Sequence, residues 1–74
     1  MNKIIPSILS VVLYTGVIDS VSDEFASIEI IKTGGGTSLM TLPVDMFPCM
    51  VTEGSLFYFE RTSDTVEIKC GTPT

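Results

Sequence analysis

The chain contains no histidine and no tryptophan, and only four of its 74 residues are lysine or arginine. Histidine is the commonest general base and the commonest metal ligand in proteins, and it is the side chain that titrates near neutral pH. Serine and cysteine nucleophiles are present, but no histidine in the chain can activate them. We therefore expect no catalytic residue, no metal site and no cofactor, and we interpret the protein as non-enzymatic.

The four basic residues, Lys3, Lys32, Arg61 and Lys69, are scattered, and nine acidic residues bring the net charge to −5. Proteins that bind nucleic acids gain most of their affinity by neutralising phosphates with lysine and arginine. Anionic membranes attract basic segments for the same reason. The charge therefore argues against nucleic-acid and membrane partners and leaves a protein partner, or a second copy of the chain, as the expected one.

Apolar residues are abundant for so short a chain: they make up 45% of it, and the mean hydropathy is +0.47. Seventy-four residues form one domain, which we place at 1–74. A domain of this size buries only about 60–65% of its unfolded surface. Some of the apolar side chains are therefore expected at an interface.

The two cysteines, Cys49 and Cys70, are too few for a four-ligand zinc site. A disulfide between them would stabilise the fold by about 3 kcal/mol. Two cysteines do not make the dense framework of a small secreted domain, and free thiols are usual in the reducing cytoplasm. We favour free thiols and a cytoplasmic location, in the host cell if the protein is viral. A secreted protein is the alternative.

Residues Ile4 to Ile18 are almost uninterruptedly apolar and follow Lys3. Such a run resembles the apolar part of a signal peptide, but no small-residue cleavage site follows it. At about fifteen residues it is also shorter than the roughly 20 that a membrane-spanning helix needs. Its β-branched residues favour a strand, although a helix remains an alternative for Ile4 to Tyr14. Gly16 predicts a bend or bulge.

Alternating polarity and turn residues predict five strands. They span Ser7–Val21, Phe25–Lys32, Ser38–Leu42, Leu56–Arg61 and Thr65–Cys70. Between the third and fourth strands, two prolines bound residues 44–48, for which we predict a single helical or 3-10 turn whose Met46 and Phe47 plug an open end. This pattern predicts an all-β fold, a small five-stranded barrel of the SH3-like or OB-like kind.

Several short motifs follow one another in an order shared with a known family. Gly16-Val17-Ile18-Asp19 leads into Ala26-Ser27-Ile28-Glu29, then Leu42-Pro43, and then Glu53-Gly54 before an apolar strand. The chain from Gly16 to Phe59 resembles a family of very short bacterial and phage domains of unknown function. The family has aspartate where Ser55 stands, and it begins near Val17. The resemblance implies a small β-barrel and transfers no catalytic residue.

The candidate interaction surface combines two apolar segments, one from the N-terminal strand and one from the fourth strand. Tyrosine and phenylalanine are enriched at protein interfaces. We therefore expect Ile4–Leu13 and Leu56–Phe59 either to pair with each other or to form the binding surface. The surface residues are Phe57, Tyr58, Phe59, Ile8, Val12 and Tyr14.

Two other segments are interpreted as structural. Asp19, Asp23 and Glu24 lack the regular ligand spacing of a calcium loop, so we interpret them as a solvated acidic turn. Thr33–Thr37 contains three glycines without the lysine of a phosphate-binding loop, so we predict a flexible hairpin loop.

Three functions remain. The favoured one is a protein-interaction module, such as an accessory or inhibitor protein of a phage or mobile element. The first alternative is a self-assembling structural subunit in which Ile4–Val12 is exchanged between copies or added to a neighbour's sheet. The second is a barrel that stacks single-stranded nucleic acid on Phe57 and Phe59.

Overall fold

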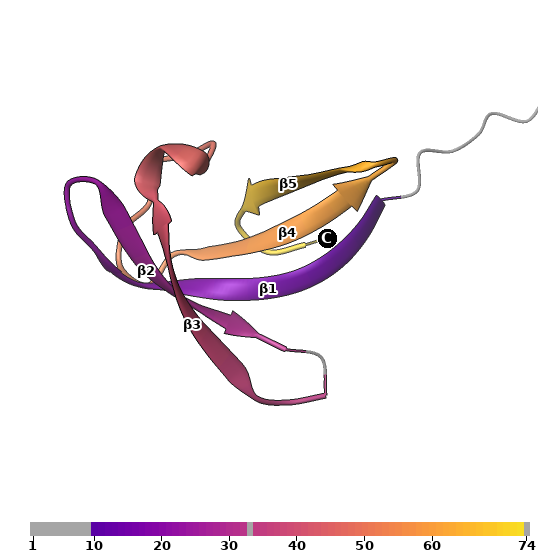
Figure 1. Ribbon diagram of the computed structural model, residues 1–74, viewed down its shortest axis with the longest axis horizontal. Helices are drawn as coiled ribbons and strands as arrows, with labels where there is room; N and C mark the ends of the chain where they lie inside the picture. The colour runs from indigo at the N-terminus through magenta and orange to yellow at the C-terminus, as the bar shows by residue number, and fades with distance from the viewer. Residues whose placement is uncertain (1–9, 33, 74) are drawn as a thin grey trace, which may run out of the picture.

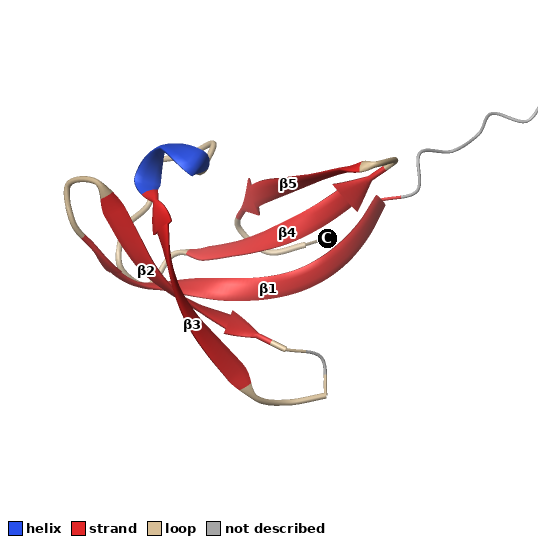
Figure 2. Cartoon of the chain, viewed as in Figure 1, coloured by secondary structure: helices blue, strands red, loops and turns tan. Residues whose placement is uncertain are grey.

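The computed structural model describes residues 10–32 and 34–73, which form five β-strands and one 3-10 turn. In chain order the elements are β1 (Ser10–Val21), β2 (Phe25–Ile31), β3 (Thr37–Pro43), η1 (Val44–Met46), β4 (Leu56–Thr62) and β5 (Thr65–Cys70) (Figures 1 and 2). The predicted all-β class, the five strands and the 3-10 turn are confirmed. Over the same ranges, no helix is long and apolar enough to cross a membrane.

All five strands belong to one antiparallel sheet with the order β3-β2-β1-β4-β5. Three consecutive strands, β1 to β3, are joined by hairpins, and β4 returns by a long connection to lie beside β1. This arrangement is a Greek key. β3 and β5 form the two edges, and within the described residues they do not pair with each other. The sheet is therefore open, and the predicted barrel is not closed by backbone pairing.

The central strand β1 bends because it carries two irregularities. Its register shifts between Val12 and Tyr14 against β4, and between Ile18 and Ser20 against β2. A β-bulge bends its strand and increases the local twist. In Figure 1, β1 curves along its length and the β2–β3 hairpin crosses the direction of β4 and β5. The prediction of a bulge at Gly16 itself is wrong, since the two irregularities flank this residue.

Glycine is required at position 16 for another reason, because two neighbouring residues approach its backbone closely. A Cβ atom at this position would lie 2.8 Å from Cε1 of Phe57 and 2.9 Å from the backbone oxygen of Glu29. The Phe57 ring therefore packs directly over the Gly16 backbone, and a neighbouring strand closes the space from the other side. Only glycine fits between them without a shift in the surrounding chain.

Substituting Gly16→Ala is expected to lower the free energy of unfolding by about 1–3 kcal/mol, because the added methyl group overpacks this space. Urea unfolding of the two proteins measures the difference. In a Phe57→Leu background, the shorter side chain relieves one of the two contacts. Gly16→Ala should then lower the free energy of unfolding by a smaller amount. Equal stability of the wild type and Gly16→Ala would contradict the described packing.

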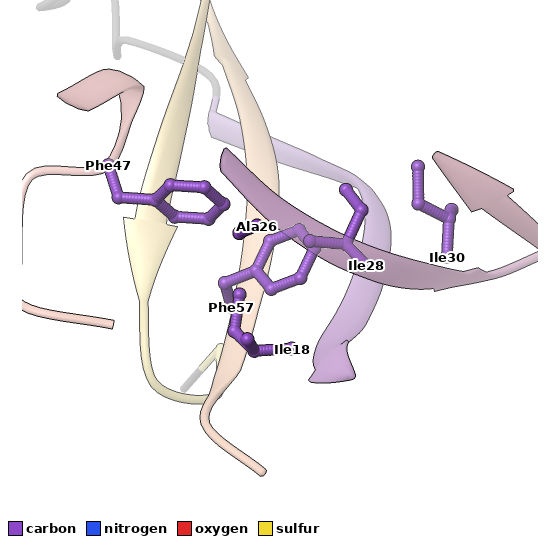
Figure 3. Packing of buried hydrophobic residues seen from close by; sticks show 6 residues of the cluster. All are labelled: Ile18, Ala26, Ile28, Ile30, Phe47 and Phe57. Carbon is purple, nitrogen blue, oxygen red and sulfur yellow. The ribbon is translucent and has the colours of Figure 1, made fainter. Parts of the chain in front are cut away.

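The core lies on the inner face of the bent sheet, where three alternate residues of β2 point (Figure 3). Its buried hydrophobic residues are Ile18, Ala26, Ile28, Ile30, Phe47 and Phe57. Phe47 comes from the β3–β4 connection, and its ring lies edge-on to Phe57, with 5.4 Å between the ring centroids. The predicted plug is thus confirmed for Phe47. For Met46 it is wrong, because this side chain is 53% exposed.

Cys49 and Cys70 are joined in a disulfide, with 6.5 Å between their Cα atoms. The expectation of free thiols is therefore wrong. The physical reason is the position of the β3–β4 connection: Phe47 anchors it in the core, which carries Cys49 to the end of β5. The disulfide fastens this connection to an edge strand of the sheet. The open side of the fold is thus held by a side-chain plug and a covalent bond rather than by strand pairing.

Candidate functional site

The face of the sheet opposite the core is the candidate site, and we call it the outer face. Residues paired across neighbouring strands share a face, and faces alternate along each strand. Since Ile28 points inward, its neighbour Glu29 points outward. Glu29 is opposite Leu39 on β3 and Val17 on β1, and Val17 is opposite Leu56 on β4. These four residues form one row across four strands.

A second row runs beside the first on the outer face. Ile31 on β2 lies opposite Thr37 on β3 and Thr15 on β1. Thr15 is opposite Tyr58 on β4, and Tyr58 is opposite Lys69 on β5. The two rows together place five large side chains close to one another: Val17, Ile31, Leu39, Leu56 and Tyr58.

Three of these five side chains are strongly exposed. Leu39 is 76% exposed, and Ile31 and Leu56 are each 47% exposed. Val17 and Tyr58 are half-buried. With strands about 4.8 Å apart, four strands span roughly 15 Å. Several exposed apolar side chains on one face of a small domain are typical of an interaction site.

Charge on the outer face is sparse in these two rows. Glu29 stands in the middle of the first row, flanked by Leu39 and Val17. Lys69 ends the second row, and its Nζ lies 3.3 Å from Oε1 of Glu67. Within residues 10–32 and 34–73 this is the only ion pair, so Glu29 has no cationic side chain beside it. The outer face can therefore bind an apolar surface of a partner that places one positive charge beside Glu29.

The six surface residues named from the sequence do not share one face. Phe57 is 1% exposed and belongs to the core, so it is not a surface residue. Phe59 packs against the core, with 5.7 Å between its ring centroid and that of Phe57. Tyr14 lies opposite Phe59 and is 46% exposed. Tyr58 points outward, as does Val12, which lies opposite Glu60. Ile8 lies outside the described residues.

The two apolar segments predicted from the sequence, Ile4–Leu13 and Leu56–Phe59, do not pair with each other within the described residues. Residues 14–17 of β1 pair with residues 56–59 of β4, and residues 10–12 pair with residues 60–62. Leu56–Phe59 is therefore covered by residues 14–17, and the expected pairing with Ile4–Leu13 is not met by residues 10–13. The part of the N-terminal segment before residue 10 lies outside the described residues.

Three outer-face residues, Val17, Ile31 and Leu39, were missed by sequence reasoning. The sequence does contain a pattern that indicates Ile31 and Leu39. Ile30-Ile31 and Leu39-Met40 are adjacent apolar pairs, and adjacent residues of a strand point to opposite faces of the sheet. One member of each pair must therefore point away from the core. The missing information was the register that brings them together.

The other segments singled out in the sequence have structural roles. Asp19, Asp23 and Glu24 are exposed. In the described ranges no group of three histidine, cysteine or acidic side chains is placed to hold a metal ion. Gly34, Gly35 and Gly36 all have positive φ, and the N–H of Lys32 donates to the carbonyl of Gly36 at 3.0 Å, so this loop closes the β2–β3 hairpin.

No family model, no curated protein and no solved structure matches this chain.

Proposed function

We propose that the protein is a non-enzymatic interaction module that binds a protein partner through the outer face of its sheet. The observation that carries this proposal is the set of apolar side chains in two adjacent rows of the outer face, of which Leu39, Ile31 and Leu56 are the most exposed. Exposing these residues to water is unfavourable by roughly 25 cal/mol for each Å² of apolar area, so covering them favours association.

The chemistry of the partner follows from the charge of this face. Glu29 lies between Leu39 and Val17 without a cation beside it in the described part of the chain. The whole chain carries a net charge of −5, which attracts a basic partner over a longer distance. The partner is therefore a protein with an apolar contact surface and a lysine or arginine that meets Glu29. An accessory or inhibitor protein of a phage or mobile element would act in this way.

The nucleic-acid alternative has one observation in its favour. A five-stranded, partly open Greek key is also the arrangement of OB-folds, which bind oligonucleotides. The electrostatics oppose it: the two outer rows carry one carboxylate and one lysine already paired with Glu67. Phe57, on which bases were expected to stack, is buried. A protein partner is therefore the better proposal.

The disulfide bears on where this module acts. Disulfides persist in oxidising compartments and are rare in the cytoplasm. The bond between Cys49 and Cys70 supports the secreted alternative over the cytoplasmic location expected from the sequence. We therefore propose that the partner is met in an oxidising compartment.

The proposed binding face is tested by quantitative affinity capture with three baits. These are the wild type, the outer-face variant Leu39→Ser/Leu56→Ser, and the control variant Met50→Ser. The control changes a side chain that is 89% exposed and lies on the β3–β4 connection, which packs on the inner face. Truncating central interface residues costs about 2 kcal/mol or more, so the outer-face variant should capture at least about tenfold less partner than the control.

A second variant tests the role assigned to Glu29. Glu29→Gln should weaken binding and flatten its dependence on salt, because one ion pair is lost while the apolar contact remains.

Equal capture by the three baits of the first experiment, or capture by none of them, would contradict the proposal that the outer face binds a protein.

A further inference from the structure

The free edge of β5 presents a defined set of backbone groups. In an antiparallel pair, the N–H and C=O groups of alternate residues point toward the neighbouring strand. The N–H of Gly71 donates to the carbonyl of Leu56 at 2.8 Å, so odd-numbered residues of this segment face β4. The backbone groups of Val66, Ile68 and Cys70 therefore point away from β4. Within the described residues, no turn or loop hydrogen-bonds to them.

Space is available beside this edge. A groove of about 570 Å³ lies between β5 and residues 45–48 of the β3–β4 connection. Its lining includes apolar side chains, Met46, Phe47, Val66 and Ile68, and charged ones, Asp45, Glu67 and Lys69. An unpaired edge beside an open groove is a template for an added strand.

The side chains at this edge are complementary to their own antiparallel image. Ile68 is flanked by Glu67 and Lys69, which both point to the outer face. If two such strands run antiparallel with Ile68 opposite Ile68, Glu67 of each strand stands opposite Lys69 of the other. Both side chains are accessible, with 56% exposure for Glu67 and 41% for Lys69.

We propose that β5 pairs with β5 of a second copy of this chain around a two-fold axis at Ile68. In this register Ile68 exchanges backbone hydrogen bonds with its counterpart, and Val66 does so with Cys70. Glu67 and Lys69 then occupy the non-hydrogen-bonded positions, where opposite side chains approach most closely. The interface is self-complementary, as a two-fold dimer requires.

Neighbouring registers are disfavoured by charge. A shift by one residue would place outer-face side chains opposite inner-face ones. A shift of the axis to Glu67 or Lys69 would place two like charges directly opposite each other, which is destabilising. An axis at Val66 or Cys70 avoids like charges but places Glu67 and Lys69 opposite uncharged residues. Only the axis at Ile68 therefore combines the backbone hydrogen bonds with two opposite-charge pairs.

The dimer goes beyond the function proposed above, since it would join two sheets edge to edge. A two-fold axis perpendicular to the joined sheets keeps both outer faces on the same side. The second row of the outer face, which ends at Lys69, would continue into the other copy. A dimer would thus present two binding faces to a partner, and its overall affinity would gain from two linked contacts.

Sedimentation equilibrium of the whole chain tests the dimer with four proteins: the wild type, Glu67→Lys, Lys69→Glu, and the double variant that exchanges the two charges. The wild type should be a dimer. Each single change places like charges opposite each other across the axis and should weaken dimerisation at least about tenfold, an effect of about 1.4 kcal/mol. The double variant restores opposite charges in the same register and should restore the dimer.

Thermal unfolding of the same proteins serves as the fold control. Within one chain Glu67→Lys loses the exposed ion pair with Lys69 but replaces the like-charge pair with Glu60 by an opposite one. Since exposed ion pairs contribute little, the two effects should nearly cancel in the stability of the monomer. A monomeric wild type, dimeric single variants or a double variant that stays monomeric would each overturn the proposal. A monomer whose β5 amides become protected from hydrogen exchange only on capturing another protein would assign this edge to a foreign strand instead. None of these changes touches Leu39 or Leu56, so failure here is distinguishable from failure of the proposed binding face.

Discussion

Replacing Phe57 by alanine is expected to lower the free energy of unfolding by about 3–5 kcal/mol, the usual cost of truncating a buried phenylalanine. Phe57 is 1% exposed and is one of the largest fully buried side chains of the described residues. Its ring makes edge contacts with Phe47 on one side and Phe59 on another, and it covers the backbone of Gly16. One truncation therefore removes contacts among β1, β4 and the β3–β4 connection.

The size of this effect matters because the domain is small. At about 0.05–0.15 kcal/mol per residue, a chain of this length has a total stability of roughly 4–11 kcal/mol. Phe57→Ala should remove a large part of it, as measured by urea unfolding followed by circular dichroism. Phe57→Leu keeps most of the volume and should cost clearly less. If the free energy of unfolding of Phe57→Ala were within about 1 kcal/mol of the wild-type value, the ring would not be at the centre of the core.

Removing the disulfide is the second change with a large expected effect. The double variant Cys49→Ser/Cys70→Ser should lose about 3 kcal/mol, because the bond closes a loop with a sequence separation of 21 residues and restricts the unfolded chain. The bond also fastens the connection that carries Phe47 into the core. Freeing this connection should raise hydrogen exchange at the Ile28 and Phe57 amides more than at the β2–β3 hairpin loop.

Chemical unfolding with and without a reductant measures this contribution. Reduction should destabilise the wild type by about the same amount as the double substitution. The double variant is the matched control and should not respond to the reductant. If the wild type unfolds at the same urea concentration in both conditions, the two cysteines are not joined in solution, and the cytoplasmic location expected from the sequence would regain its support.

The positions of the strands follow from local sequence patterns. The alternation in Ala26-Ser27-Ile28-Glu29-Ile30 specifies both a strand and its inner face, because only one set of alternate residues is apolar. Pro43 ends a strand, since it has no N–H to donate to the sheet. These signals act over two to five residues, so they are readable without knowledge of the fold.

The pairing of the strands does not follow from local patterns. Leu56-Phe57-Tyr58-Phe59 is apolar on both faces, so its periodicity cannot tell which face is buried. The choice is made by Gly16, whose missing side chain leaves room for the Phe57 ring from the neighbouring strand. The same kind of long-range contact, between Phe47 and the core, brings Cys49 to Cys70. The outer face likewise depends on the register of four strands.

Site-specific photo-cross-linking can show whether the outer face of the sheet binds a protein. A photoreactive amino acid is placed at Leu39 on the outer face or at Met50 on the β3–β4 connection. Both positions are strongly exposed, so both probes are equally free to react. We expect a covalent adduct with one partner from position 39 and none from position 50. Adducts of equal yield from both positions, or an adduct from position 50 alone, would contradict this expectation.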